Sequence, residues 1–119
     1  MARILTSILT AAALSFAASS ASAFEQINRA DQFVAAISGK ALTRVGIRLT
    51  VSPGGEIQGR AFGRPVSGDW SWQDGYFCRD LRWGQKELGY NCQMVQRDGT
   101  ALRFTSDRGE GMYADLWLR

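Results

Sequence analysis

The most constraining feature of the sequence is a two-residue alternation of apolar side chains that begins near Thr43 and continues to the C-terminus. In TRVGIRLTV, for example, one face carries Val45, Ile47, Leu49 and Val51. Alternation with period two is typical of β-strands that are buried on one side. Gly-, Asp- and Pro-rich segments interrupt the pattern as turns between strands do. The pattern predicts seven strands, over residues 43–51, 56–62, 66–72, 76–83, 88–97, 100–106 and 112–119.

So many short antiparallel strands favour a sheet that curls or closes, because closure removes its unpaired edges. We therefore expect a mainly β fold, an antiparallel meander of seven or eight strands forming a small barrel. One short helix is expected before it, over about residues 28–39. Asn28 can cap the start of this helix, and Gly39 stands where a glycine often follows a helix end. The apolar face of the helix consists of Ala30, Phe33, Val34 and Ile37.

The N-terminal residues read as a signal peptide. Arg3 provides a positive charge, residues 4–16 are mostly apolar, and Ala21-Ser22-Ala23 fits the pattern that signal peptidase reads. We expect cleavage after Ala23, leaving one domain over residues 24–119 that is periplasmic or secreted. No second apolar segment of about 20 residues follows, so no membrane span is expected after cleavage.

Cys78 and Cys92 both lie in the expected exported part. An even cysteine count in an oxidising compartment indicates a disulfide. The chain has no histidine, which removes the commonest general base and the commonest zinc ligand. We therefore expect no catalytic site, metal or cofactor. Acidic and basic residues interleave with a net charge of +3, so nucleic acid is not an expected partner.

The register of the strands depends on two Asp-Gly turns. A two-residue turn at Asp74-Gly75 places Trp70 and Trp72 on the face opposite Cys78. A three-residue loop, Gln73-Asp74-Gly75, places them on the same face. The same choice arises at Asp98-Gly99, where the three-residue loop pairs Met94 with Leu102 and the alternative brings Arg103 to that face. We favour the three-residue loop at both turns, because it collects the bulky apolar residues on one face.

This register predicts the interior of the barrel. From the central strands it collects Trp70, Trp72, Tyr76, Cys78, Leu88, Tyr90, Cys92, Met94, Leu102 and Phe104. The other strands complete it with Val45, Ile47, Leu49, Ile57, Val66, Leu116 and Leu118.

Two surfaces are candidates for binding. A small barrel is either filled by side chains or holds one small ligand. We favour a filled core, with a ligand site among the interior residues Trp70, Trp72, Tyr76 and Tyr90 as the alternative. Aromatic and arginine side chains on the outer face would suit a protein partner. This expected partner surface comprises Phe77, Arg79, Leu81, Trp83, Tyr113 and Trp117.

Two further sequence patterns resemble ligand-binding motifs but are not expected to form binding sites. GEGMYA, residues 109–114, matches a dinucleotide-binding pattern, but that mechanism needs a helix to begin there. Only a strand-like segment follows, so a hairpin turn is expected. Asp107, Glu110 and Asp115 lack the spacing of a calcium-binding loop and are expected to be solvated.

The long stretch from GRAFGRPVSGDWSWQDGYFCR to NCQMVQRDGTALRFTSDRGEG resembles a group of small secreted proteins of alphaproteobacteria, largely uncharacterised. Some of these carry an automatic dihydrodipicolinate reductase label. The present sequence contradicts that activity, since it is expected to be exported and lacks both a Rossmann unit and a histidine-rich substrate site. In architecture it is more loosely similar to periplasmic barrel inhibitors of proteases and lysozyme.

The sequence thus favours an exported module without catalytic activity that recognises a protein or an envelope component. The alternative is a lipocalin-like carrier of a small molecule, and an enzyme is the least expected. A carrier requires an internal cavity, whereas a partner-binding module requires an exposed aromatic patch. The partner's identity and the oligomeric state are left open.

Overall fold

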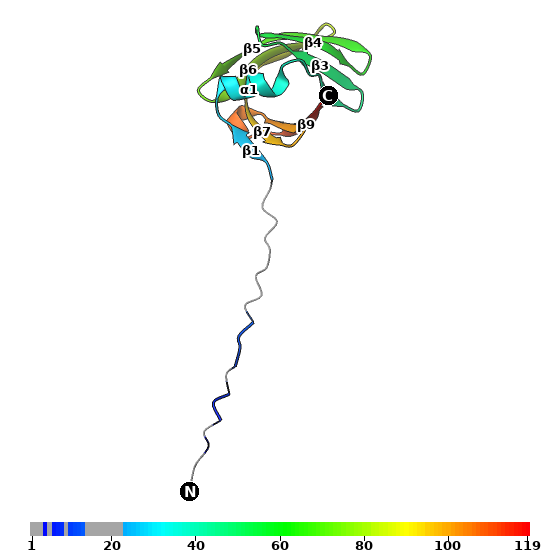
Figure 1. The fold of residues 1–119 in the computed structure, drawn as a ribbon. Coiled ribbons are helices and arrows are strands. Elements are labelled where there is room, and N and C mark those ends of the chain that lie inside the picture. The colour runs from blue at the N-terminus through cyan, green and yellow to red at the C-terminus, as the bar shows by residue number, and fades with distance from the viewer. Residues whose placement is uncertain (1–3, 5, 9, 14–22) are drawn as a thin grey trace.

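The computed structural model of this chain describes residue 4 and residues 6–8, 10–13 and 23–119 (Figure 1). The predicted signal peptide, residues 1–23, lies largely outside them, so the peptide and its cleavage point stay predictions. No helix in the described ranges is long and apolar enough to cross a membrane.

The described residues form nine strands, one α-helix and one short 3₁₀ turn. In chain order these are β1 (Glu25–Ile27), α1 (Ala30–Ile37), β2 (Leu42–Arg44), β3 (Ile47–Val51), β4 (Glu56–Ala61), β5 (Arg64–Gln73), β6 (Tyr76–Trp83), β7 (Lys86–Asp98), β8 (Ala101–Thr105), η1 (Asp107–Gly109) and β9 (Tyr113–Leu118).

The strands β2 to β9 form a closed antiparallel barrel, which confirms the predicted fold class. Consecutive strands from β2 to β9 pair with one another, and β9 also pairs with β2. Closure leaves these eight strands without a free sheet edge along their paired residues. The additional strand β1 pairs with the last part of β7, where Ile27 lies opposite Val95.

The helix α1 lies across one end of the barrel (Figure 1). Its buried side chains, Phe33, Ala36 and Ile37, face the core. Gly39 follows the helix with φ of +71°, as predicted for a glycine after a helix end. The expected cap at Asn28 is wrong: Arg29 occupies that position, and no side chain caps the helix start.

The predicted strand over residues 43–51 is divided in two. Arg44 pairs with Ile47, so Val45 and Gly46 form a tight turn between β2 and β3. Gly46 has φ of +79°, a conformation that glycine adopts without steric cost. Val45 is therefore 92% exposed at the tip of this turn, and its predicted place in the interior is wrong.

The predicted three-residue loop between β5 and β6 is also wrong. Gln73 pairs with Tyr76, and Ser71 lies opposite Cys78. Asp74 and Gly75 form a two-residue turn with φ of +53° and +87°. Two successive positive φ values are typical of the type I′ turn, whose twist matches that of the flanking strands. Trp70 and Trp72 therefore lie on the face opposite the cysteines.

The predicted three-residue loop at Asp98-Gly99 is wrong as well, and the central residues of the observed turn are Gly99 and Thr100. Asp98 pairs with Ala101 across a two-residue turn, and Met94 pairs with Thr105 instead of Leu102. Arg103 thus shares a face with Met94, whereas Leu102 and Phe104 are buried on the other face. The observed partner of Met94 lies three residues further along the chain than the predicted one, and a shift by an odd number of residues moves every side chain to the opposite face.

The observed core differs from the prediction accordingly. The predicted interior positions of Tyr76, Cys78, Tyr90, Cys92 and Met94 are wrong, since these residues lie on the face opposite the core residue Phe77. Leu49, Ile57, Val66, Trp70, Trp72, Leu102, Phe104, Leu116 and Leu118 belong to the core as predicted, and Ile47 and Leu88 lie at its open end. The core further contains Ile27, Phe33, Ile37, Leu42, Val51, Phe77, Val95, Ala61, Leu81 and Trp83.

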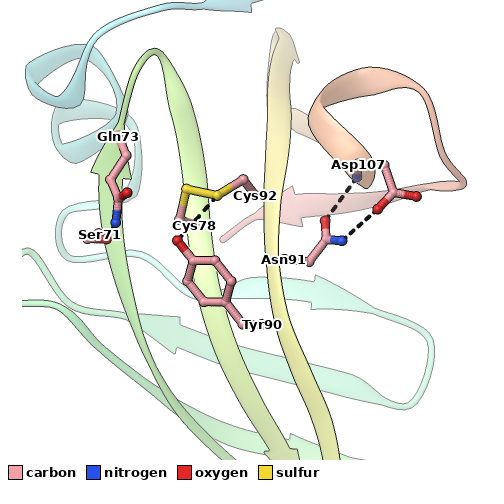
Figure 2. The surroundings of a disulfide bond; sticks show 7 residues. All are labelled: Ser71, Gln73, Cys78, Tyr90, Asn91, Cys92 and Asp107. Carbon is pink, nitrogen blue, oxygen red and sulfur yellow. Dashed lines mark hydrogen bonds between the residues drawn. A yellow bond between two sulfur atoms is a disulfide. The ribbon is translucent and has the colours of Figure 1, made fainter.

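The predicted disulfide is present and lies on the outer face of the barrel (Figure 2). Cys78 on β6 and Cys92 on β7 are direct cross-strand partners. The Tyr90 hydroxyl lies 3.4 Å from the Sγ of Cys92. On the other side of β7 from Cys92, the Asn91 side chain donates to the carboxylate of Asp107 and accepts from its backbone N–H, which ties η1 to β7 (Figure 2).

An ion pair between Arg103 and Asp115 joins β8 to β9. Two N–H groups of Arg103 donate to the two carboxylate oxygens of Asp115 at 2.8 and 3.0 Å. The guanidinium lies 4.2 Å from the ring centre of Phe24 and 4.1 Å from that of Tyr113. The hydrogen bond from Arg103 holds the pKa of Asp115 below its ordinary value. Bidentate pairs of this kind are the stronger class of surface ion pair.

We predict that Asp115→Asn lowers stability at neutral pH and removes part of its acid sensitivity. Because the native pKa is depressed, the stabilisation by Asp115 is complete above its unfolded pKa of about 3.9 and is lost as the pH falls through the native pKa. Thermal unfolding from pH 7 down to pH 2 measures this. The melting temperatures of the wild type and of Asp115→Asn should converge towards pH 2. A constant difference between the two melting temperatures at every pH would contradict the prediction.

Candidate functional site in the barrel interior

A half-open pocket of about 160 Å³ extends into the interior of the barrel, and we call it the interior cavity. Its walls come from every barrel strand except β5 and are almost entirely apolar. The lining residues are Leu42, Leu49, Val51, Ile57, Phe77, Arg79, Leu81, Gln93, Phe104, Ala114 and Leu116. An internal cavity is the feature that the carrier hypothesis requires, whereas the favoured expectation was a filled core.

Arg79 is the one charged residue that lines this cavity. It lies on β6 directly opposite Trp70, on the inner face of the barrel. The guanidinium is half-buried and donates one hydrogen bond, to the carbonyl oxygen of Gly89 at 2.8 Å. No carboxylate of the described residues forms an ion pair with it.

Partial burial also affects the electrostatics of this residue. Desolvation lowers the pKa of Arg79, and the charge of its neighbour Asp80 only partly opposes the shift. Arginine nevertheless stays protonated in proteins at any physiological pH. The cavity wall therefore carries a fixed positive charge. The remaining N–H donors of Arg79 have no protein partner among the described residues and are accessible to solvent, because no buried side-chain nitrogen there lacks a partner.

Gln93 supplies the other polar group in the cavity lining. It lies on β7 opposite Phe77, and its amide nitrogen donates to the Ser106 hydroxyl at 3.3 Å. Ser106 precedes η1, so this contact helps to fix the connection between β8 and β9 beside the cavity.

A second hollow lies at the end of the barrel that α1 does not cover. Its volume is about 270 Å³, and its lining is Ile47, Leu49, Ala61, Phe62, Val66, Leu81, Trp83 and Leu88. We call this hollow the mouth. Leu49 and Leu81 line both the mouth and the interior cavity. The indole N–H of Trp83 donates to the Ala61 carbonyl at 2.7 Å, so its polar atom is satisfied there.

The predicted ligand site of four aromatic residues does not form. Trp70 and Trp72 lie at the helix end of the barrel, where both pack against Phe33. Their indole N–H groups donate to backbone carbonyls of Ser52 and Asn28. Tyr76 lies on the outer face under the guanidinium of Arg108.

The fourth residue of that site, Tyr90, is 60% exposed on the outer face. The four aromatic residues thus occupy both faces of the sheet, because the turn at Asp74-Gly75 has two residues rather than three.

The predicted partner surface is contradicted for four of its six residues. Phe77, Arg79 and Leu81 line the interior cavity, and Trp83 lines the mouth. Tyr113 and Trp117 are exposed on β9, as predicted. The aromatic patch that a partner-binding module requires is therefore reduced to these two.

The remaining sequence patterns form no site. GEGMYA leads from η1 into the strand β9, and no helix begins there. Asp107 is bound to Asn91, and Asp115 is paired with Arg103. The described residues contain no group of three or more side chains able to hold a metal ion.

Sequence reasoning missed Arg79 and Gln93 as interior residues. The available signal was the Asp-Gly pair itself, which is among the strongest indicators of a two-residue hairpin. With that turn, alternation along β6 places Phe77 and Arg79 inside.

Comparisons with protein-family models, with curated proteins and with solved structures found no match. The resemblance to small secreted alphaproteobacterial proteins, and the looser similarity to barrel inhibitors, therefore stay predictions.

Proposed function

We propose that this chain is an exported binding protein without catalytic activity, which holds a small apolar carboxylate inside its barrel. The carboxylate contacts the Arg79 guanidinium, and the apolar body of the ligand fills the cavity. This proposal develops the alternative of a small-molecule carrier, and it adds Arg79 as the charged residue that holds the ligand. The observation that carries it is the positive charge of Arg79 in an apolar cavity with no acidic partner.

The energetics of burial support an anionic ligand. A charged group removed from water is costly unless it is paired and hydrogen-bonded. Arg79 is half-buried and uses one donor, so it retains donors in the planar arrangement that matches a carboxylate. A bound carboxylate would supply the missing charge and accept those donors.

The volume of the cavity limits the size of the ligand. Apolar protein cavities of about 150 Å³ bind a molecule the size of benzene. The cavity, at about 160 Å³, therefore suits a body of about six carbon atoms. Hexanoate and benzoate are the simplest members of this class.

The lining chemistry favours binding over catalysis. The two polar residues of the lining are Arg79 and Gln93. Arginine does not give up its proton, and an amide side chain neither accepts nor donates one in a reaction at neutral pH. The disulfide supports an exported location, because disulfides persist in oxidising compartments.

Binding of hexanoate to the wild-type protein and to Arg79→Met tests the proposal. Charge-assisted hydrogen bonds contribute about 2 kcal/mol, so we expect hexanoate to bind Arg79→Met roughly thirtyfold more weakly. Isothermal titration calorimetry measures the dissociation constants. Arg79→Met should unfold at the same or a higher temperature than wild type, because it removes a half-buried charge without an acidic partner.

Two controls distinguish a direct contact with Arg79 from a general effect of the protein's positive charge on hexanoate binding. Arg97→Met removes an exposed arginine of β7 that donates to Gly99 and should leave hexanoate binding unchanged. Hexanol has a similar apolar body without the charge and should bind wild type and Arg79→Met equally. The proposal fails if neither hexanoate nor benzoate binds, or if Arg79→Met binds hexanoate as tightly as wild type does.

A further inference from the structure

We propose that the mouth of the barrel docks onto an anionic lipid membrane. The docking surface is formed by the tips of three hairpin turns, residues 44–48, 60–64 and 82–87, together with Leu88. This inference goes beyond the proposed ligand binding and does not depend on what the interior cavity holds.

The three turns lie side by side at the end of the barrel opposite α1. The backbone N–H of Phe62 donates to the Gly46 carbonyl at 2.8 Å, which joins the first two turns. The backbone N–H of Gly84 donates to the Pro65 carbonyl at 2.7 Å, which joins the second and third. The tips therefore form one continuous surface rather than three independent loops.

Phe62 is the most informative residue of this surface. It occupies the first central position of the turn between β4 and β5 with φ of +52°, and Gly63 follows with φ of +80°. Asparagine, aspartate and glycine are strongly preferred in such a turn, and a bulky residue there is strained. Its side chain is nevertheless 68% exposed, and its one close neighbour at the tip is Gly46 of the first turn, over which one edge of the ring lies.

Folding gains the contact with Gly46 from this ring, but most of the Phe62 side chain stays in solvent. Backbone strain that no packing interaction offsets is more often found at functional positions. Two further apolar side chains project near it: Val45 is 92% exposed, and Leu88 is 46% exposed. Val45 and Phe62 thus give two of the three turns an apolar tip, and Leu88 lies on β7 just after the third turn.

Basic residues surround these apolar tips. The three turns carry Arg44, Arg48, Arg60, Arg64, Arg82 and Lys86. They thus contain six of the chain's 14 basic residues and only one of its 11 acidic residues, Glu87. The positive charge of the chain is therefore concentrated at the mouth, although its overall net charge is only +3.

Apolar side chains surrounded by arginine and lysine suit a lipid surface, in which an apolar acyl region lies beneath a layer of phosphate groups. The tips enter the boundary of the acyl chains, and the basic side chains remain at the level of the phosphates. Each basic residue near an anionic leaflet adds to the attraction, which salt screens. If the proposed function is correct, docking here also places the apolar mouth against the membrane, where an apolar carboxylate would enter or leave.

Flotation with lipid vesicles tests the inference. We would use protein isolated from the periplasmic fraction, with its N-terminus identified by intact mass so that all variants are alike. Equimolar phosphatidylglycerol and phosphatidylcholine vesicles should bind the protein at low salt. Phosphatidylcholine vesicles should bind it at least about tenfold more weakly.

Phe62→Asn is the decisive variant, because asparagine is preferred at this turn position and the protein should fold at least as stably. We expect Phe62→Asn and Lys86→Glu each to reduce vesicle binding by about tenfold. The matched controls Ala35→Asn and Lys40→Glu make similar changes at exposed positions of α1 and the segment after it, and should leave vesicle binding unchanged.

Equal losses in the mouth variants and in their controls would overturn the inference, as would no binding to anionic vesicles. Binding of a purified protein partner that Phe62→Asn abolishes, without any vesicle binding, would also overturn it. The outcome is separable from that of the proposed function. Arg79→Met should still bind vesicles, and Phe62→Asn should still bind hexanoate.

Discussion

Replacing Phe33 by alanine is expected to lower the free energy of unfolding by about 3–5 kcal/mol. The Phe33 side chain has no exposed surface. Its ring centre lies 5.0 to 5.3 Å from those of Trp70, Trp72 and Phe77, and 6.5 Å from that of Phe104. Truncation removes this packing and leaves a cavity where α1 closes the barrel, which the neighbouring strands cannot fill.

Urea denaturation of wild type and of Phe33→Ala measures the effect. Val34→Ala on the same helix is the matched control, because Val34 is only half-buried and its truncation should cost about 1 kcal/mol or less. A loss below about 1 kcal/mol for Phe33→Ala would contradict the role of α1 as a packed closure of the barrel.

Removal of the disulfide should have the second-largest effect. Cys78 and Cys92 are 14 residues apart in sequence and join β6 to β7. A closed loop of this length stabilises a fold by about 3 kcal/mol, chiefly by restricting the unfolded chain. We therefore expect the double variant Cys78→Ala with Cys92→Ala to lose about that amount.

Urea denaturation with and without reductant checks this prediction. Reductant should destabilise the wild type by about the same amount and should not affect the double variant. Alkylation of the oxidised native protein should add no mass. Equal stability of the reduced and oxidised wild type, or a labelled native cysteine, would contradict the account of the disulfide.

Several elements could be predicted from the sequence because their signals are local. The short helix followed by Gly39 depends on apolar spacing and on one glycine with positive φ. The disulfide follows from the even cysteine count. Buried strand residues such as Ile57 and Leu118 follow from alternation within their own strands.

The choice of inner face could not be settled in the same way. Both faces of β6 carry apolar residues, since Phe77 and Leu81 alternate with Tyr76 and Cys78. Alternation along this strand therefore fits either orientation. We resolved the ambiguity by placing the cysteines with the tryptophans, but a disulfide between adjacent strands fits the outer face equally well.

The candidate site was missed for the same reason. In the predicted register Arg79 pointed to solvent, where an arginine needs no explanation. The observed turn at Asp74-Gly75 turns its side chain inward. Phe62 was missed because an aromatic residue followed by Gly63 lacks the usual composition of a type I′ turn. Only the backbone shows its positive φ.

The central claim is that the interior binds an apolar carboxylate at Arg79, and nuclear Overhauser contacts between ligand and protein test it most directly. With hexanoate bound, we expect cross-peaks from its methyl protons to methyl groups of Leu49, Leu81 or Leu116, with a shift of the Arg79 Nε–H resonance. Cross-peaks to exposed residues only, or an unchanged Arg79 resonance at saturating hexanoate, would contradict the claim.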